Sequence, residues 1–160
     1  MRLTFPRAIL ALVAFAFLLA PMPARAAPRP ALPTPADLER ALSAAVAAWG
    51  ATSADPVSIK LAALNACDVT ADAHPVIAST VTTWTAFDGG ARSYSHVIEI
   101  NSGCDWRMQP LGNAVLHEYG HILMGADHSS DPHSVMFWIV KGTRQRITTL
   151  DRARLAEVIP

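Results

Sequence analysis

The chain has 160 residues, with 13 Lys and Arg against 13 Asp and Glu, so its formal net charge is zero. Hydrophobic residues make up 51% of the chain and charged residues 16%, which is more apolar than the average soluble domain. A neutral chain is not a strongly basic nucleic-acid-binding protein, and a chain this apolar is not an acidic disordered one. The length suits one domain, or two small ones at most.

The first 26 residues predict a secretory signal peptide. Arg2 and Arg7 precede an uninterrupted apolar run over 9–20, and small residues suit cleavage after Ala26. A helix of that run would be about 18 Å long, too short for a hydrocarbon core of about 30 Å, which argues against a membrane anchor. The removed segment holds three arginines and no acidic residue, so the remaining 134 residues carry a net charge of −3. We expect a secreted protein, extracellular or periplasmic, that is not attached to a membrane after cleavage.

The two cysteines of the chain, Cys67 and Cys104, are expected to form one disulfide. Export places them in an oxidising compartment, and neither lies in a C-x-x-C or nucleophile motif. The bridge would close a loop of 37 residues and stabilise the fold by about 3–4 kcal/mol on the chain-entropy model. A free nucleophile and a metal thiolate are the alternatives.

A Pro/Ala-rich lead-in over 27–36 is followed by a predicted α+β domain over 37–160. Apolar residues at helical spacing alternate with β-branched segments, and Thr148-x-x-Asp151 indicates a capped C-terminal helix. The order of these elements predicts a mixed, twisted sheet with helices packed on it. We predict helices over 37–49, 110–124 and 148–158, strands over 58–64, 76–85 and 94–101, and a turn over 87–90.

The motif H-E-x-x-H begins at His117 on the second predicted helix. Residues i and i+4 of a helix lie about 40° apart around its axis, so His117 and His121 can direct two imidazoles at one ion. Two imidazoles and a third protein ligand leave one zinc position for water, whose pKa the metal lowers towards about 7. Glu118 is rotated about 100° from His117, so it can take a proton from that zinc-bound water and later pass one to a leaving amine.

With the residues that follow, the chain resembles the metzincin zinc peptidases, and among them the matrixin-like branch. Their signature continues from the second histidine as x-x-G-x-x-H and ends in a turn containing Met. Here Gly125 and His128 resemble the Gly-x-x-His half, and Met136 stands eight residues after His128. The resemblance is clear over 115–137. It implies a small metzincin-like domain in which Met136 forms an apolar floor beneath the zinc.

The resemblance also implies where the substrate cleft lies. The strand around Ile98 would be an edge strand that lines the cleft and pairs with substrate backbone, opposite the helix that bears His117. Residues 137–146 would shape the pocket for the first residue after the cut. Trp138 stands where some metzincins carry a Tyr near the metal, so a zinc-linked Tyr is absent at that position.

The chain departs from the signature by one residue. The signature has Gly three residues after the second histidine and the third ligand six residues after it, whereas Met124 and Asp127 stand at those positions here. In one interpretation, a residue is inserted before Gly125, so that the turn and the ligand His128 are shifted together along the chain. In the other, the spacing is kept and Asp127 binds the metal, as in snapalysin-like enzymes. The second interpretation puts Met124 where a positive φ is wanted. The glycine and the Met-turn spacing favour His128, and Asp127 remains the alternative third ligand.

The remaining histidines give no second metal site. His133 is expected to be exposed, and His74 and His96 are expected on the surface or in a strand. Asp88 and His96 have a spacing similar to the matrixin structural-zinc loop, but the upstream partner is missing, so no second zinc is predicted. No acidic cluster resembles a calcium loop, and no cysteine-switch propeptide is present.

These observations predict a secreted, monomeric endopeptidase with one catalytic zinc, held by His117, His121 and His128, and with Glu118 as general base and acid. Its substrate would be a peptide or protein, and no nucleic acid is expected as a partner. A different class of function stays open, namely a zinc-binding but catalytically weak or inactive domain that binds a protein partner. A third possibility is a structural exported domain in which the motif is accidental.

Overall fold

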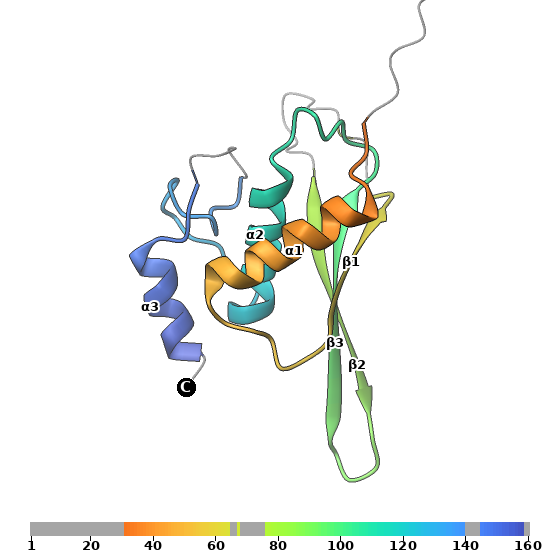
Figure 1. Ribbon diagram of the computed structural model, residues 1–160. Helices are drawn as coiled ribbons and strands as arrows, with labels where there is room; N and C mark the ends of the chain where they lie inside the picture. The colour runs from red at the N-terminus through yellow and green to blue at the C-terminus, as the bar shows by residue number, and fades with distance from the viewer. Residues whose placement is uncertain (1–30, 65–66, 68–75, 140–144, 159–160) are drawn as a thin grey trace, which may run out of the picture.

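A computed structural model of the chain describes residues 31–64, 67, 76–139 and 145–158. The described part is a small α+β domain with three helices and a mixed three-stranded sheet (Figure 1). Every predicted helix and strand is confirmed, with ends that move by one or two residues. The signal peptide at 1–26 lies outside the described residues. The elements are α1 Pro35–Trp49, β1 Val57–Ala62, β2 Ala78–Ala86, β3 Arg92–Asn101, α2 Leu111–Met124 and α3 Thr149–Val158.

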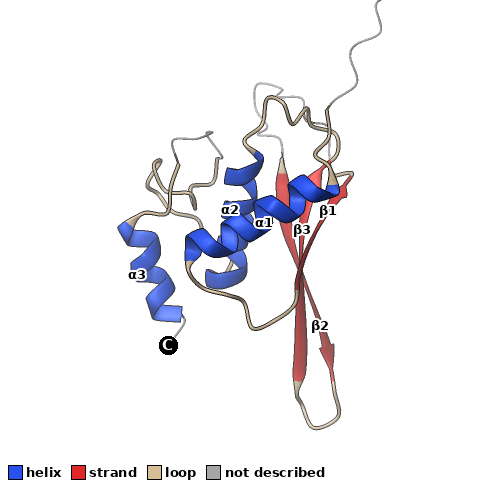
Figure 2. Cartoon of the chain, viewed as in Figure 1, coloured by secondary structure: helices blue, strands red, loops and turns tan. Residues whose placement is uncertain are grey.

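The sheet has the order β1-β3-β2, with β1 parallel and β2 antiparallel to the central β3 (Figure 2). This corrects the expectation that the strand around Ile98 is an edge strand. β3 has a neighbouring strand on each side, and its Ile98 and Ile100 are fully buried in the core. β2 is instead an edge strand of the described sheet, and its Ser- and Thr-rich sequence and mostly exposed side chains suit that position.

Beyond the helices, β2 and β3 continue as a two-stranded ribbon (Figure 1). The predicted turn closes it, and Gly89 and Gly90 supply the positive φ values of 90° and 85°. Trp84 is 56% exposed on this ribbon, and the guanidinium of Arg92 lies 4.7 Å from the centre of its ring. The ribbon therefore carries its aromatic side chain on the outside, with a cation–π contact as support.

Helix α1 begins with a well-defined cap. Thr34 and Asp37 form a reciprocal capping box, Pro35 occupies the first turn, and Gly50 ends the helix at φ 68°. The helix therefore starts two residues before the predicted start at 37. The described end of the lead-in is also held against the domain, because the backbone N–H of Trp106 donates to the carbonyl of Ala31 at 3.0 Å.

The core lies between α1, α2 and the sheet. The indole N–H of Trp49, at the end of α1, donates to the backbone carbonyl of Leu116 in α2 at 2.9 Å, so the two helices meet at a fixed point. Gly120 makes this contact possible, because a Cβ there would come within 2.8 Å of the Trp49 ring and would overlap the Met136 thioether. A side chain at position 120 would push both buried residues away from α2.

The predicted disulfide between Cys67 and Cys104 is confirmed, with a Cα–Cα distance of 5.0 Å. It connects the segment after β1 to the turn after β3, and Cys104 is fully buried. Within the described residues, no helix is both long enough and apolar enough to cross a membrane.

Gly120→Ala is expected to lower the free energy of unfolding by about 1–3 kcal/mol, because the added methyl overpacks the contact with Trp49 and Met136. Gly112→Ala is the matched control, since a Cβ at position 112 meets open space in the same helix. The control should leave stability unchanged or raise it by up to about 1 kcal/mol through helix propensity. Urea unfolding of both variants checks this, and equal stabilities would contradict the packing described here.

Candidate metal centre

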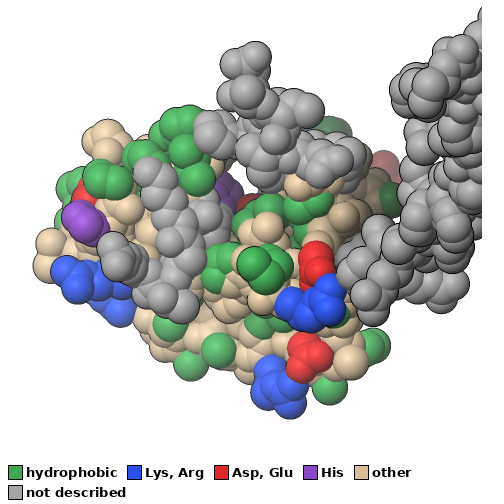
Figure 3. All heavy atoms as spheres, turned by 90° about the horizontal axis from the view of Figure 1, so that it is seen from above, with side chains coloured by type: hydrophobic (Ala, Val, Ile, Leu, Met, Phe, Trp, Pro, Cys, Tyr) green, Lys and Arg blue, Asp and Glu red, His purple; other side chains and the backbone are tan. Residues whose placement is uncertain are grey.

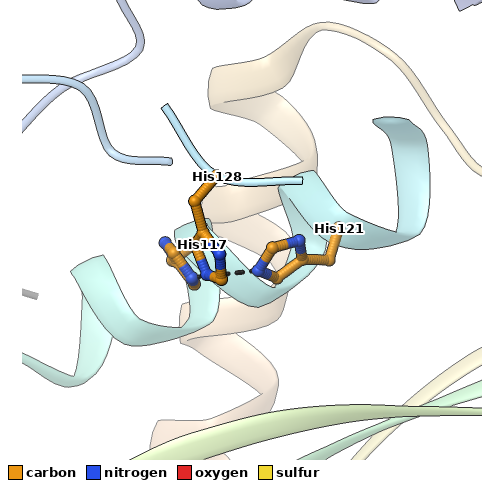
Figure 4. Close-up of side chains that lie close together, drawn as sticks. All are labelled: His117, His121 and His128. Carbon is orange, nitrogen blue, oxygen red and sulfur yellow. Dashed lines mark hydrogen bonds between the residues drawn. The ribbon is translucent and has the colours of Figure 1, made fainter. Parts of the chain in front are cut away.

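Three histidines converge beside the C-terminal half of α2 (Figure 4). His117 and His121 lie one turn apart on the helix, and His128 reaches them from the segment that follows it. One ligand atom from each ring lies within 4.8 Å of the other two, which makes this a group able to hold one metal ion. The structure therefore brings together the three histidines predicted from the sequence.

Backbone carbonyls fix how two of these rings are protonated. Nδ1 of His117 lies 2.6 Å from the carbonyl oxygen of Val135, and Nδ1 of His121 lies 2.9 Å from that of Gly125. A carbonyl oxygen only accepts, so both Nδ1 atoms donate and both Nε2 atoms carry a lone pair at neutral charge. These bonds leave the Nε2 atoms free to act as metal ligands, with the ring orientation set from outside.

The two Nε2 atoms lie 3.0 Å apart, facing each other (Figure 4). Two lone pairs at this distance repel, and a cation between them converts the repulsion into two favourable contacts. Nitrogens bound to a tetrahedral zinc at 2.0–2.1 Å are separated by about 3.3 Å, close to the observed distance. The donor set and the spacing of this pair are thus compatible with one metal ion.

The departure from the motif spacing is resolved at the end of α2. Met124 is the last residue of the helix and Gly125 follows it at φ 89°, while no non-glycine residue of the described chain has a positive φ. Asp127 turns away from the histidines, since its side chain is 85% exposed and accepts from Arg154 at 2.8 Å. The helix is one residue longer than in the signature, and the turn delivers His128 to the site.

Glu118 lies beside the histidines and is 7% exposed. The hydroxyl of Thr80, on β2, donates to its Oε2 at 2.8 Å and lies 3.0 Å from its backbone carbonyl. Burial raises the pKa of the Glu118 carboxyl, whereas the Thr80 hydrogen bond and the charge of His121 oppose that rise. Nothing in the sequence indicated Thr80, because the contact joins residues 38 positions apart.

Met136 lies fully buried against α2, with its thioether next to Gly120. Its backbone N–H donates to the hydroxyl oxygen of Ser134 at 2.9 Å, and that hydroxyl donates to Asp151 at 2.7 Å. Asp151 also accepts from the backbone N–H and the hydroxyl of Thr148, which is the capping box predicted for α3. One buried carboxylate thus connects the start of α3 to the turn that carries Met136.

A cleft of about 710 Å³ opens over the histidines. One side is formed by β2 and the residues before it, and the other by Trp138 and Ile139. The cleft therefore lies between edge strand β2 and α2, not beside the strand around Ile98. Of the segment 137–146 expected to shape it, residues 140–144 lie outside the described part. Figure 3 shows histidine side chains recessed in a hollow of this face.

The other predicted residues lie apart from this group. His133 is exposed as expected, and Asp88 is exposed in the turn of the ribbon. His96 lies in β3, where its Nδ1 is 2.9 Å from the Thr82 hydroxyl and its Nε2 is 3.8 Å from Asp55. His74 lies outside the described residues.

Substitution of the third ligand distinguishes His128 from Asp127. His128→Ala is expected to lower zinc affinity at least about tenfold, because it removes one of three nitrogen donors. Asp127→Asn is the matched control, and it should leave affinity within about twofold because this carboxylate points at Arg154. Titration with a competing zinc chelator measures both constants. A larger loss for Asp127→Asn than for His128→Ala would contradict the geometry.

The metal-free protein is expected to lose stability in acid through His117. Burial lowers the pKa of this histidine from 6.5 to about 4, so the unfolded chain binds a proton that the folded chain does not. The stabilisation is full above pH 6.5 and falls by about 3 kcal/mol as the pH drops to about 4. Glu118 has the opposite sign, because its raised pKa gives stability that is present in acid and lost as the pH rises through that pKa.

Urea unfolding at about pH 7 and about pH 4.5, with a chelator present, tests both signs. The loss of stability should be smaller for His117→Gln than for wild type, and larger for Glu118→Gln. A His117→Gln protein that loses as much as wild type would show that this histidine does not carry the effect.

Comparison with known proteins adds no family to this description, because no protein-family model and no curated protein matches the chain. The resemblance to the metzincins therefore rests on the sequence of residues 115–137. The structure itself shows three histidines that can hold one metal ion, a buried glutamate beside them, and a cleft that opens over both.

Proposed function

We propose that this protein is a zinc-dependent endopeptidase of metzincin-like type, acting after export. The observation that carries the proposal is the convergence of His117, His121 and His128 at the base of a cleft that Glu118 also lines. A three-nitrogen donor set with an open side is typical of catalytic rather than structural zinc sites, which use four protein ligands.

When bound, zinc would supply Lewis acidity, which polarises a peptide carbonyl and lowers the pKa of water. The protein contributes the proton transfers. Glu118, as a buried carboxylate with a raised pKa, is suited to take a proton from water and to return one to the leaving amine. The Thr80 hydrogen bond holds that carboxylate at the surface of the cleft.

The edge position of β2 supports a polypeptide as the substrate. Within the described sheet β2 pairs only with β3, so its other edge presents unpaired backbone groups along the cleft. An extended peptide can add to such an edge through main-chain hydrogen bonds. The apolar Trp138 and Ile139 on the opposite side would contact side chains of the bound segment.

Cleavage of a mixed library of quenched fluorescent peptides by the purified protein tests the proposal. Zinc-loaded wild type should cleave, a chelator should stop cleavage, and Glu118→Gln should lower kcat/KM by about 10²–10⁴-fold while keeping zinc. Asp127→Asn is the control, because its carboxylate faces Arg154 outside the cleft.

Three other results would each reject the peptidase. Equal cleavage by wild type and Glu118→Gln would defeat the mechanism. Stoichiometric zinc without any cleavage would favour the alternative, a zinc-binding domain that binds a protein partner. A folded protein that retains no zinc would reject both.

A further inference from the structure

We propose that Thr80 is a positioning residue, which fixes the carboxylate of Glu118 in the orientation that peptide hydrolysis requires. The inference rests on the proposed peptidase function and deepens it. It assigns a role to a residue of the cleft-lining strand that lies outside the H-E-x-x-H motif.

The geometry places the Thr80 hydroxyl 2.8 Å from Oε2 of Glu118. Among the described residues, Thr80 is the only hydrogen-bond donor to this carboxylate. A glutamate side chain has three rotatable bonds, and a catalytic base must keep its oxygens in one place to be effective. A charge-assisted hydrogen bond of this length supplies that restraint to a side chain that is largely buried.

The hydrogen bond holds one carboxylate oxygen of Glu118 and thereby fixes the orientation of the other. With Oε2 held towards β2, rotation about the last side-chain bond is restricted, and Oε1 is the oxygen available for a proton. The same hydroxyl also lies 3.0 Å from the Glu118 backbone carbonyl. It thus has a second acceptor on the same residue, so it keeps a partner if the carboxylate shifts during turnover.

Thr80 is suited to the task by its own position. Its β-branched side chain has few rotamers in a strand, so the direction of the hydroxyl is set before the bond forms. The backbone of β2 is in turn held by pairing with β3, where Thr80 lies opposite the buried Ile98. The strand that lines the cleft therefore also holds the Glu118 carboxylate, so the position of the carboxylate is fixed relative to the cleft wall.

Three variants test the role in peptide cleavage. Thr80→Val removes the hydroxyl at constant shape and should lower kcat about tenfold or more, with KM changed less than about threefold. Thr80→Ser restores the hydroxyl and should recover most of kcat. Thr83→Val is the matched control, because this hydroxyl on the same strand contacts Ser95 at 2.7 Å and faces away from the cleft lining. Zinc content should stay at the wild-type value in all three.

A second measurement does not depend on activity. In the metal-free protein, Thr80→Val should raise the unfolding equilibrium constant, by a factor at least about fivefold larger in the wild-type background than in the Glu118→Leu background. Effects that add within about twofold would show that the hydrogen bond is not formed in solution and would overturn the proposal.

The two proposals fail in different ways. Wild-type kcat in Thr80→Val, with cleavage still abolished by Glu118→Gln, would reject the positioning role alone. Failure of the serine variant to recover kcat, despite normal zinc content, would also reject it. Absence of cleavage by zinc-loaded wild type would reject the peptidase and, with it, a positioning role in hydrolysis.

Discussion

The arrangement of the site depends on two hydrogen bonds from imidazole Nδ1 atoms to backbone carbonyls. They commit His117 and His121 to the tautomer with a bare Nε2 and turn the two lone pairs towards each other at 3.0 Å. Without a cation this placement costs free energy, since like partial charges face each other in a partly buried site. The two imidazoles keep this orientation because the carbonyls of Val135 and Gly125 belong to segments that the fold holds in place independently of the histidines.

Each carbonyl has its own support. That of Gly125 is placed by the turn ending α2, where only glycine takes the required φ. That of Val135 is placed by the buried turn around Met136, which Ser134 and Asp151 attach to the start of α3. The C-terminal helix thus helps to place His117 without supplying a side chain to the histidine group, as outer-shell partners do in metal sites.

The sequence predicted most of this fold, because its signals are local. Capping residues, helical periodicity and the turn at 87–90 each act over a few residues, and all the predicted helices and strands are present. The three histidines were predicted for the same reason, since a helix fixes the i, i+4 pair. Gly125 indicated where the helix ends, which was enough to favour His128 over Asp127.

The strand order and the contacts of Glu118 could not be predicted in this way. Alternation of residues in β3 shows which face is buried but not how many neighbours the strand has. The edge position expected for the strand around Ile98 rested on the resemblance to the metzincins, and it is wrong because β3 is the central strand. The Thr80 contact depends on which strand lies next to α2, a property of the sheet as a whole. Long-range pairings of this kind cannot be recognised from any short segment of the sequence.

The disulfide constrains one part of the site directly and the other part only indirectly. The loop between Cys67 and Cys104 contains all of β2 and β3, and with them Thr80 and part of the cleft lining. The three histidines that could hold a metal ion all lie after Cys104. On the chain-entropy model, loss of the bridge would remove a constraint from the loop that contains β2 and β3 and would lower the stability of the folded domain. The three histidines lie outside that loop, so the bridge constrains the cleft-lining strand directly and the histidine segment only through its packing.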